Sequence, residues 1–256
     1  MFSTLIIGEP GSGKTTVALT APKPIVVLDI DNKLHKMDSA KPLIKSGDII
    51  QWAIDEPLSM MGLTRLATSK NEHGKEPKVI QQQPRGYIKF VEYVDKLVAS
   101  KGVVDGRKIG TVVLDTYTTL TEHLKRLILA CNEKLNMTMP LYGTLLTNYE
   151  EINNTLLRLP CNVIFLCHQK VDKDELTGKI SYRPHIEGQM ADKIGKDFEE
   201  MYYMQKSIIG LGATAVAKYE MMTVGDGMRS CRTSHALPSL VEPSLCKIYG
   251  LPERVS

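Results

Sequence analysis

Short apolar runs with β-branched residues recur along the first two thirds of the chain. Residues 25–31 (IVVLDID) and 162–168 (NVIFLCH) each hold four or more consecutive apolar side chains. Runs of this kind, with little alternation between apolar and polar positions, predict strands that are buried on both faces, as in a parallel sheet. The predicted strands lie at residues 2–7, 25–31, 48–54, 111–115 and 162–168.

In the segments between these runs, apolar residues recur with a period close to 3.6, which predicts helices there. The segment 86–101 shows it clearly, and its predicted buried stripe consists of Ile88, Val91, Val94, Leu97 and Val98. Strands that alternate with helices in this way predict an α/β fold. The other predicted helices lie at residues 15–20, 120–135 and 145–159, and residues 136–144 join the last two.

The last third of the chain turns toward strands. Residues 213–224 and 228–234 are predicted strands that flank Gly225-Asp226-Gly227, a sequence that favours a tight hairpin turn. Phe198–Met204 is a further predicted strand, and the prolines after residue 236 predict an irregular tail. We therefore expect one domain over residues 1–256, with its core at about 2–235 and its tail at 236–256.

Two polar stretches, at residues 62–86 and 171–187, predict surface loops. The first has an excess of basic side chains that continues to Lys89, so it is either a solvated loop or a flap that contacts phosphate groups. The second begins directly after the apolar run that ends at His168.

Composition narrows the class of protein. The chain has 256 residues, 43% of them hydrophobic, and a formal net charge of +3, which excludes a strongly basic nucleic-acid coat but leaves room for a local basic groove. No apolar run approaches the ~20 residues of a membrane span. The five cysteines form no C-x-x-C pair, which argues against a disulfide framework or a zinc site and favours a cytoplasmic location.

The most specific motif is Gly8-Glu9-Pro10-Gly11-Ser12-Gly13-Lys14-Thr15, which fits G-x-x-x-x-G-K-[ST] at every fixed position. Its glycines let backbone N–H groups point at phosphate oxygens, Lys14 can reach the β- and γ-phosphates, and the Thr15 hydroxyl can bind Mg²⁺. A dinucleotide fingerprint fits poorly because Thr16 stands where G-x-G-x-x-G needs a small residue. The predicted nucleotide-binding residues are Gly8, Glu9, Pro10, Gly11, Ser12, Gly13, Lys14, Thr15 and Thr16.

Polar side chains end three of the predicted strands. Asp115 follows an apolar strand, and such a carboxylate beside a phosphate loop can hold Mg²⁺. Asp29 and Asp31 end the strand after the phosphate-loop helix, where strand alternation predicts that both face the same way and can polarise an attacking water. His168 ends the apolar strand at residues 162–168 and is a candidate sensor of the γ-phosphate.

The order of these motifs resembles the RecA-type P-loop ATPase core, in particular the small phage-encoded ATP-binding proteins of single-strand annealing and recombination. It is also similar to the motor core of replicative helicases. The resemblance covers roughly residues 2–235, and only the phosphate loop is specific as a sequence. It implies a RecA-like P-loop NTPase fold, with a mostly parallel sheet flanked by helices and an antiparallel C-terminal hairpin.

The resemblance also implies roles for individual residues. Lys14 and Thr15 would bind ATP and Mg²⁺, and Asp115 would position the metal. Asp31 takes the place of the family's catalytic glutamate, although it is one methylene shorter, so Asp29 is the alternative base. His168 matches the γ-phosphate sensor, and Arg229 or Arg232, which follow the Gly-Asp-Gly turn, could reach the γ-phosphate of a neighbouring subunit. The predicted catalytic residues are Lys14, Asp31, Asp115, His168 and Arg232.

Implied partners follow from the same resemblance. Residues 136–144 and 171–187 match the two loops that face single-stranded DNA, and Tyr142 and Tyr182 could stack on bases. We expect DNA-stimulated ATP hydrolysis, a homo-oligomeric ring or filament, a single-strand DNA-binding protein as a further partner, no membrane contact, and a place in the host cytoplasm. Because the phosphate loop begins at residue 8, a filament tethered through a preceding segment is not expected.

Two other functions fit a phosphate loop. A small-molecule kinase would need an acceptor pocket and an arginine-rich lid, for which Arg183 alone is weak support. A nucleotide-dependent clamp or loader for a replication protein would need a helical lid, whereas strands and prolines follow residue 210.

Overall fold

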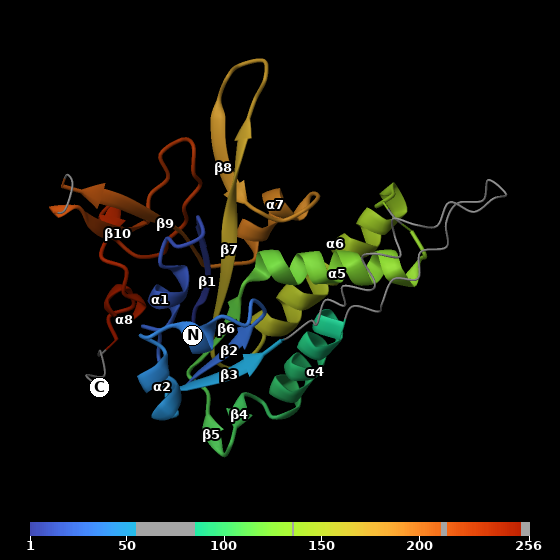
Figure 1. Ribbon diagram of the computed structural model, residues 1–256, viewed down its shortest axis with the longest axis horizontal. Coiled ribbons are helices and arrows are strands. Elements are labelled where there is room, and N and C mark those ends of the chain that lie inside the picture. The colour runs from blue at the N-terminus through green and yellow to red at the C-terminus, as the bar shows by residue number, and fades with distance from the viewer. Residues whose placement is uncertain (55–84, 135, 211–213, 252–256) are drawn as a thin grey trace.

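A mostly parallel sheet forms the centre of the computed structural model, which describes residues 1–54, 85–134, 136–210 and 214–251 (Figure 1). The strand order is β11-β10-β9-β1-β7-β6-β2-β3, and the strands from β9 to β3 run parallel. The parallel strands are β1 (Ser3–Gly8), β2 (Ile25–Asp29), β3 (Ile49–Ala53), β6 (Thr111–Asp115), β7 (Asn162–Lys173) and β9 (Glu200–Ile209). The antiparallel edge is β10 (Val216–Met222) and β11 (Leu240–Val241).

Strand register brings the predicted site residues to one edge of the sheet. Gly8, the last residue of β1, pairs with His168 of β7, and Asp29 of β2 pairs with Asp115 of β6. These four of the parallel strands therefore present their carboxyl ends on the same side, where ligands bind in open α/β sheets.

Alternation along each strand fills two hydrophobic cores. Leu5 and Ile7 of β1 face one core and Ile6 faces the other. Three long helices cover the first face and three short ones cover the second (Figure 1). The long helices are α4 (Arg85–Ala99), α5 (Tyr117–Cys131) and α6 (Met139–Leu157); the short ones are α1 (Lys14–Ala18), α2 (Lys41–Lys45) and α8 (Leu245–Ile248).

The helix α4 is where the sequence predicted it, but it is rotated relative to the prediction. Val94 and Leu97 are buried as expected, whereas Ile88, Val91 and Val98 are exposed. Tyr87 and Phe90 are buried instead, because the sequence allows a second stripe one residue earlier and the larger aromatic side chains bury more surface there. The predicted loop at 62–86 and the basic segment that continues to Lys89 lie mostly outside the described residues, and α4 already begins at Arg85.

The predicted polar loop at 171–187 is wrong. The strand β7 continues to Lys173 and pairs antiparallel with β8 (Ile180–Pro184), which makes a hairpin that projects from the sheet (Figure 1). Both strands are polar because solvent surrounds the hairpin, so no apolar pattern marks them in the sequence. The predicted connection at 136–144 is also too long, since α6 begins at Met139 with a proline in its first turn.

The antiparallel C-terminal hairpin exists, but β9 and β10 form it. The predicted turn at Gly225-Asp226-Gly227 is not a hairpin turn: the Asp226 carboxylate accepts hydrogen bonds from the N–H groups of Met228 and Arg229, and the predicted strand at 228–234 makes one isolated bridge between Met201 and Arg232. The predicted irregular tail includes β11 and α8, with Leu245 fully buried.

These corrections leave the expected fold class confirmed: a RecA-like α/β fold with a mostly parallel sheet, flanking helices and an antiparallel hairpin. Within the described ranges, no helix is long and apolar enough to cross a membrane. The remaining short elements are η1 (Leu34–Lys36), β4 (Val103–Val104), β5 (Arg107–Lys108), α7 (Met190–Lys193) and η2 (Ile194–Lys196).

Candidate nucleotide-binding site

The phosphate loop follows β1 and depends on its glycines. Gly11 and Gly13 have φ angles of 75° and 90°, which favour glycine. A Cβ atom at Gly8 would lie 2.6 Å from Ser12 Oγ and 2.8 Å from the Met204 carbonyl oxygen, so the neighbouring β9 leaves no room for a side chain. The loop is therefore shaped by backbone conformation and by close packing against the sheet.

Lys14 is buried at the base of this loop. Its Nζ donates to the carbonyl oxygens of Gly8 and Glu9, both at 2.8 Å, and lies 3.4 Å from His168 Nδ1. Burial lowers the pKa of Lys14 to about 8, and the negative charge of Asp115 partly opposes that shift. The ammonium thus stands where phosphate oxygens could replace solvent around it.

Thr15 and Asp115 meet across the sheet edge. The Thr15 hydroxyl donates to Asp115 Oδ2 at 2.7 Å. Burial raises the pKa of Asp115 to about 6, the Thr15 hydrogen bond opposes this shift, and the charge of Asp31 adds to it. A carboxylate with this environment gains from a nearby cation.

The donor set here fits Mg²⁺. Thr15 and Asp115 offer hard oxygen atoms of the kind that Mg²⁺ prefers, together with phosphate oxygens. Ser12 Oγ is buried within the loop and has no hydrogen-bond partner among the described residues, which is the situation expected of a hydroxyl that faces a ligand. No cluster of three or more His, Cys, Asp or Glu side chains in those residues could hold a metal by itself.

Asp29 and Asp31 do not face the same way, which corrects the prediction from strand alternation. The strand β2 ends at Asp29, and Asn32 adopts a φ of 49°, so Asp31 lies in a turn. The buried Asp29 carboxylate accepts from the backbone N–H groups of Lys33 and Leu34 and from the Gln51 amide. Its oxygens hold the turn together, and Asp31 alone of the two lines the cavity.

Asp31 is itself held in place from two sides. Its Oδ1 accepts from the Thr119 hydroxyl at 2.6 Å, and its Oδ2 lies 3.1 Å from Lys33 Nζ. Thr119 belongs to the first turn of α5, directly after Asp115 and the N-cap Thr116. The start of α5 therefore holds Asp31 close to the end of β6, where Asp115 lies.

His168 lies next to the phosphate loop, as the sequence predicted. Its backbone N–H donates to the Thr118 hydroxyl at 3.0 Å, and its carbonyl oxygen accepts from His185 N–H at 2.7 Å. Burial and the charge of Lys14 lower the pKa of His168, so the ring is neutral near pH 7. The following residue, Gln169, donates to the Glu9 carboxylate at 2.9 Å and links β7 to the loop.

The cavity around these groups has a volume of about 580 Å³ and includes residues that the sequence did not indicate. Tyr219 of β10 lies closest: its ring is 3.3 Å from the Cβ position of Gly13. The Nζ of Lys206 lies 5.6 Å from the centre of the same ring. Only the pairing of β10 with β9 brings these residues to the loop. The newly identified lining residues are Val17, Lys33, Leu34, Met37, Thr116, Met204, Tyr219 and Pro243.

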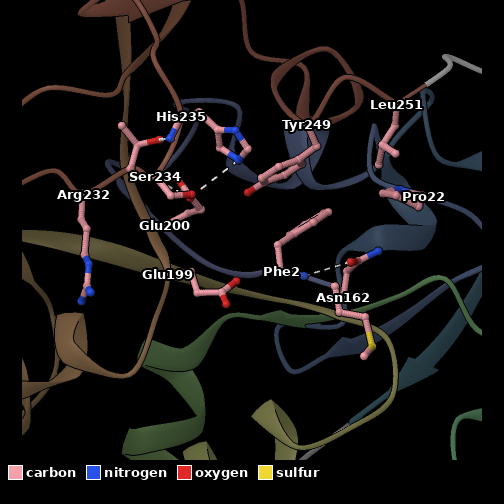
Figure 2. A pocket seen from close by; sticks show the side chains of 12 residues that line it. Phe2, Pro22, Asn162, Glu199, Glu200, Arg232, Ser234, His235, Tyr249 and Leu251 are labelled. Atoms are coloured by element: carbon pink, nitrogen blue, oxygen red, sulfur yellow. Dashed lines mark hydrogen bonds and ion pairs between the residues drawn. The ribbon is translucent and has the colours of Figure 1, made fainter.

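Arg232 lies elsewhere. It lines a second cavity of about 910 Å³ at the amino-terminal edge of the strands, near Phe2 and Asn162 (Figure 2). No ion pair or hydrogen bond joins its side chain to the other residues drawn there, whereas the buried Glu200 accepts from Ser234. A role of Arg232 in its own chain's nucleotide site is therefore excluded, and its role toward a neighbouring subunit stays a prediction.

Arg229, the other candidate, is held by groups of its own chain. It forms an ion pair with Asp226 at 2.6 Å and lies over the Tyr182 ring at 4.1 Å from its centre. Tyr182 was predicted to stack on bases, but Arg229 covers one face of it. The Tyr203 hydroxyl also donates to the Tyr182 carbonyl oxygen, so these contacts fix the base of the β7–β8 hairpin.

The two segments predicted to face DNA are neighbours in space. Gly188, which follows the hairpin, has a Cβ position 3.7 Å from the Tyr142 ring at the start of α6. Glu187 forms an ion pair with Lys125 of α5 at 2.5 Å. The hairpin, α7 and the beginning of α6 thus form one surface (Figure 1).

Residues 2–225 match the protein family described as AAA domain. Among solved structures, the flagellar accessory protein FlaH from Methanocaldococcus jannaschii is 11% identical to this chain, with a TM-score of 0.43 over 100% of this chain and 90% of that chain. An ATPase from the type III secretion system of pathogenic bacteria is 9% identical, with a TM-score of 0.47 over 80% of this chain and 51% of that chain. Similarities this low carry no argument about function, and no curated protein matches.

The family match and the site agree on the chemistry. The phosphate loop, the buried Asp115 and the RecA-like strand order together support an ATPase of the P-loop type.

Proposed function

We propose that this chain, which belongs to the AAA domain family, is an ATPase that binds single-stranded DNA and acts in strand annealing or recombination. One observation carries the DNA part of the proposal: β7 sets His168 beside the phosphate loop and continues without a break into the projecting hairpin. A change at the terminal phosphate would thus reach the hairpin through a single strand. The phage-encoded proteins that the sequence resembles suggest the same role.

In this proposal Lys14 binds the β- and γ-phosphates with the backbone N–H groups of the loop. Asp31 orients the attacking water and receives its proton, while Thr119 fixes the carboxylate. His168 donates a ring N–H to the terminal phosphate. Mg²⁺, held by Thr15 and Asp115, would supply charge neutralisation for the triphosphate.

Tyr219 is our candidate for the wall against which the base stacks. Its ring borders the loop at Gly13, and Met204 and Pro243 line the cavity with it. An aromatic ring that borders the cavity offers a flat apolar surface on which a base can stack.

The hairpin surface carries exposed lysines together with acidic side chains. Lys170, Lys173 and Lys179 are exposed along it, Asp172, Asp174 and Glu175 lie between them in the sequence, and Leu176 at its tip is 98% exposed. Tyr142 lies on the adjoining start of α6. Positive charge that follows a backbone, with apolar groups for base stacking, binds single strands without strong sequence preference.

A charge-reversal experiment tests the DNA part. We expect a Lys170→Glu, Lys173→Glu, Lys179→Glu variant to bind labelled oligo-dT at least ~10-fold more weakly at low salt, because each lysine removed is a lost phosphate contact. The matched control reverses Lys45, Lys108 and Lys101, which lie at the other end of the molecule, and should bind as the unaltered protein does. Equal binding by both variants would contradict the hairpin as the DNA surface.

A further inference from the structure

A second basic side chain, in addition to Lys14, lines the nucleotide cavity. Its described lining includes two basic side chains, Lys14 and Lys33, and no arginine. Lys14 belongs to the loop after β1, whereas Lys33 follows β2, three strands along the sheet. The two ammonium groups therefore enter the cavity from different sides.

The backbone at Lys33 is rigid. Its N–H donates to Asp29 Oδ1 at 3.2 Å, and the next N–H, at Leu34, donates to Asp29 Oδ2 at 2.9 Å. Leu34 is buried in the core beneath this turn. The buried Asp29 thus fixes the point from which the Lys33 side chain extends.

The Lys33 side chain itself extends largely into solvent. It is 71% exposed, and its Nζ contacts Asp31 Oδ2 at 3.1 Å, while Asp31 is only 12% exposed. The positive charge of Lys33 also acts on His168, where it contributes to the lowered pKa of the ring. Lys33 is therefore close to both groups that are placed around a terminal phosphate.

The contact with Asp31 poses a conflict for hydrolysis. The Thr119 hydroxyl occupies Oδ1 of Asp31, and the Lys33 ammonium occupies Oδ2. A water that attacks phosphorus must donate a hydrogen bond to one of these oxygens. Each carboxylate oxygen can accept more than one hydrogen bond, but the Lys33 ammonium competes with the water for Oδ2 until Lys33 moves to another anion.

We propose that Lys33 is a second phosphate-binding cation supplied by the same chain, and that it moves from Asp31 Oδ2 to the terminal phosphate when a triphosphate binds. This inference rests on the ATPase function proposed above. The exchange neutralises charge on the γ-phosphate and removes the ammonium that competes with the water for Oδ2. The water oxygen then bonds to phosphorus, the bond to the β–γ bridging oxygen breaks with its electron pair leaving on ADP, and the water's proton passes to Asp31 and on to phosphate.

Lys33→Met, which removes the charge and keeps the length, tests this step. We expect basal ATP turnover without DNA to fall roughly 10- to 100-fold, as for loss of a phosphate-stabilising group. Affinity for a non-hydrolysable triphosphate analogue should fall severalfold, while ADP affinity stays within about twofold, since ADP has no γ-phosphate. Lys33→Arg should keep most of the turnover. Lys36→Met, one turn away and exposed, is the matched control and should leave every value unchanged.

Each result decides the inference. Turnover of Lys33→Met within twofold of the unaltered protein, or an equal loss of ADP and triphosphate affinity, would overturn it. If the unaltered protein hydrolyses ATP without any response to DNA, the DNA proposal fails and the Lys33 test still stands. If it hydrolyses no ATP at all, the ratio of triphosphate to ADP affinity in Lys33→Met still decides whether Lys33 binds the γ-phosphate.

Discussion

The Thr15 hydroxyl donates a hydrogen bond of 2.7 Å to the carboxylate of Asp115, a residue 100 positions further along the chain. The phosphate loop and the end of β6 are two strands apart in the sheet, with β7 between them. The contact therefore shows that the two motifs on which metal and phosphate binding depend lie next to each other.

Asp115 gives the stability of the protein a specific pH dependence. Its folded-state pKa, about 6, lies above the ordinary value, so the folded state binds more protons than the unfolded state between about pH 4 and 6. The contribution of Asp115 to the free energy of unfolding therefore falls as pH rises through that window. Urea unfolding at pH 4.5 and pH 7 should show Asp115→Asn gaining stability over the unaltered protein only at the higher pH.

The affinity for nucleotide should depend on pH in the opposite direction to stability. Below pH 6 a protonated Asp115 cannot attract a cation, so affinity for the Mg²⁺ complex of a fluorescent nucleotide should fall. Affinity without Mg²⁺ should change less over the same range. A Mg²⁺-dependent affinity that stays constant from pH 5 to pH 7.5 would contradict the role of Asp115.

Substitutions at Asp29 and Asp31 should have different effects, the first on stability and the second on turnover. Asp29→Asn weakens three hydrogen bonds to a buried carboxylate, so the free energy of unfolding should fall by roughly 1–3 kcal/mol. Asp31→Asn should change stability little and lower kcat by roughly 10²-fold or more, because the amide cannot accept a proton. Thermal unfolding and steady-state turnover on the same two variants give the comparison. If Asp29→Asn is stable but loses turnover while Asp31→Asn stays active, Asp29 is the catalytic base and Asp31 is not.

Tyr219 should contribute to nucleotide affinity through its ring. Tyr219→Ala should weaken ATP and ADP binding equally, by roughly 5- to 10-fold, as for loss of one aromatic stacking contact. Tyr219→Phe keeps the ring and is the matched control. Fluorescence titration of both variants checks this, and unchanged affinity in Tyr219→Ala would place the base elsewhere.

Arg232 can be tested by mixing variants. If Arg232 completes the site of a neighbouring subunit, Arg232→Ala and Lys14→Ala should each be inactive alone. Their mixture should regain activity, because some sites then combine an intact Lys14 with a neighbour's intact Arg232. Failure to regain activity, or full activity of Arg232→Ala alone, would contradict a trans role.

The sequence allowed the parallel strands to be predicted because their apolar runs are long and nearly uninterrupted. Val163–Cys167 and Ile25–Leu28 could hardly be anything but buried. The phosphate loop was equally clear, since few sequences can form a nest of inward N–H groups. Asp115 and His168 followed from strand ends, which parallel pairing gathers at one edge.

Other features depend on contacts that local sequence does not encode. The β7–β8 hairpin has solvent on both faces, so no apolar period marks it. Asp29 and Asp31 differ because β2 ends at Asp29, and a strand end is poorly marked by a pattern that continues through Ile30. Tyr219 and Lys33 reach the cavity only through the pairing of β10 with β9 and through the turn fixed by Asp29.

The decisive experiment for this protein is to measure ATP turnover with and without single-stranded DNA. We expect hydrolysis that single-stranded DNA accelerates, and a Lys14→Ala variant that remains folded but loses both the basal and the stimulated rates by roughly 10²-fold or more. Turnover that survives in Lys14→Ala, or turnover that single-stranded DNA leaves unchanged, would contradict this expectation.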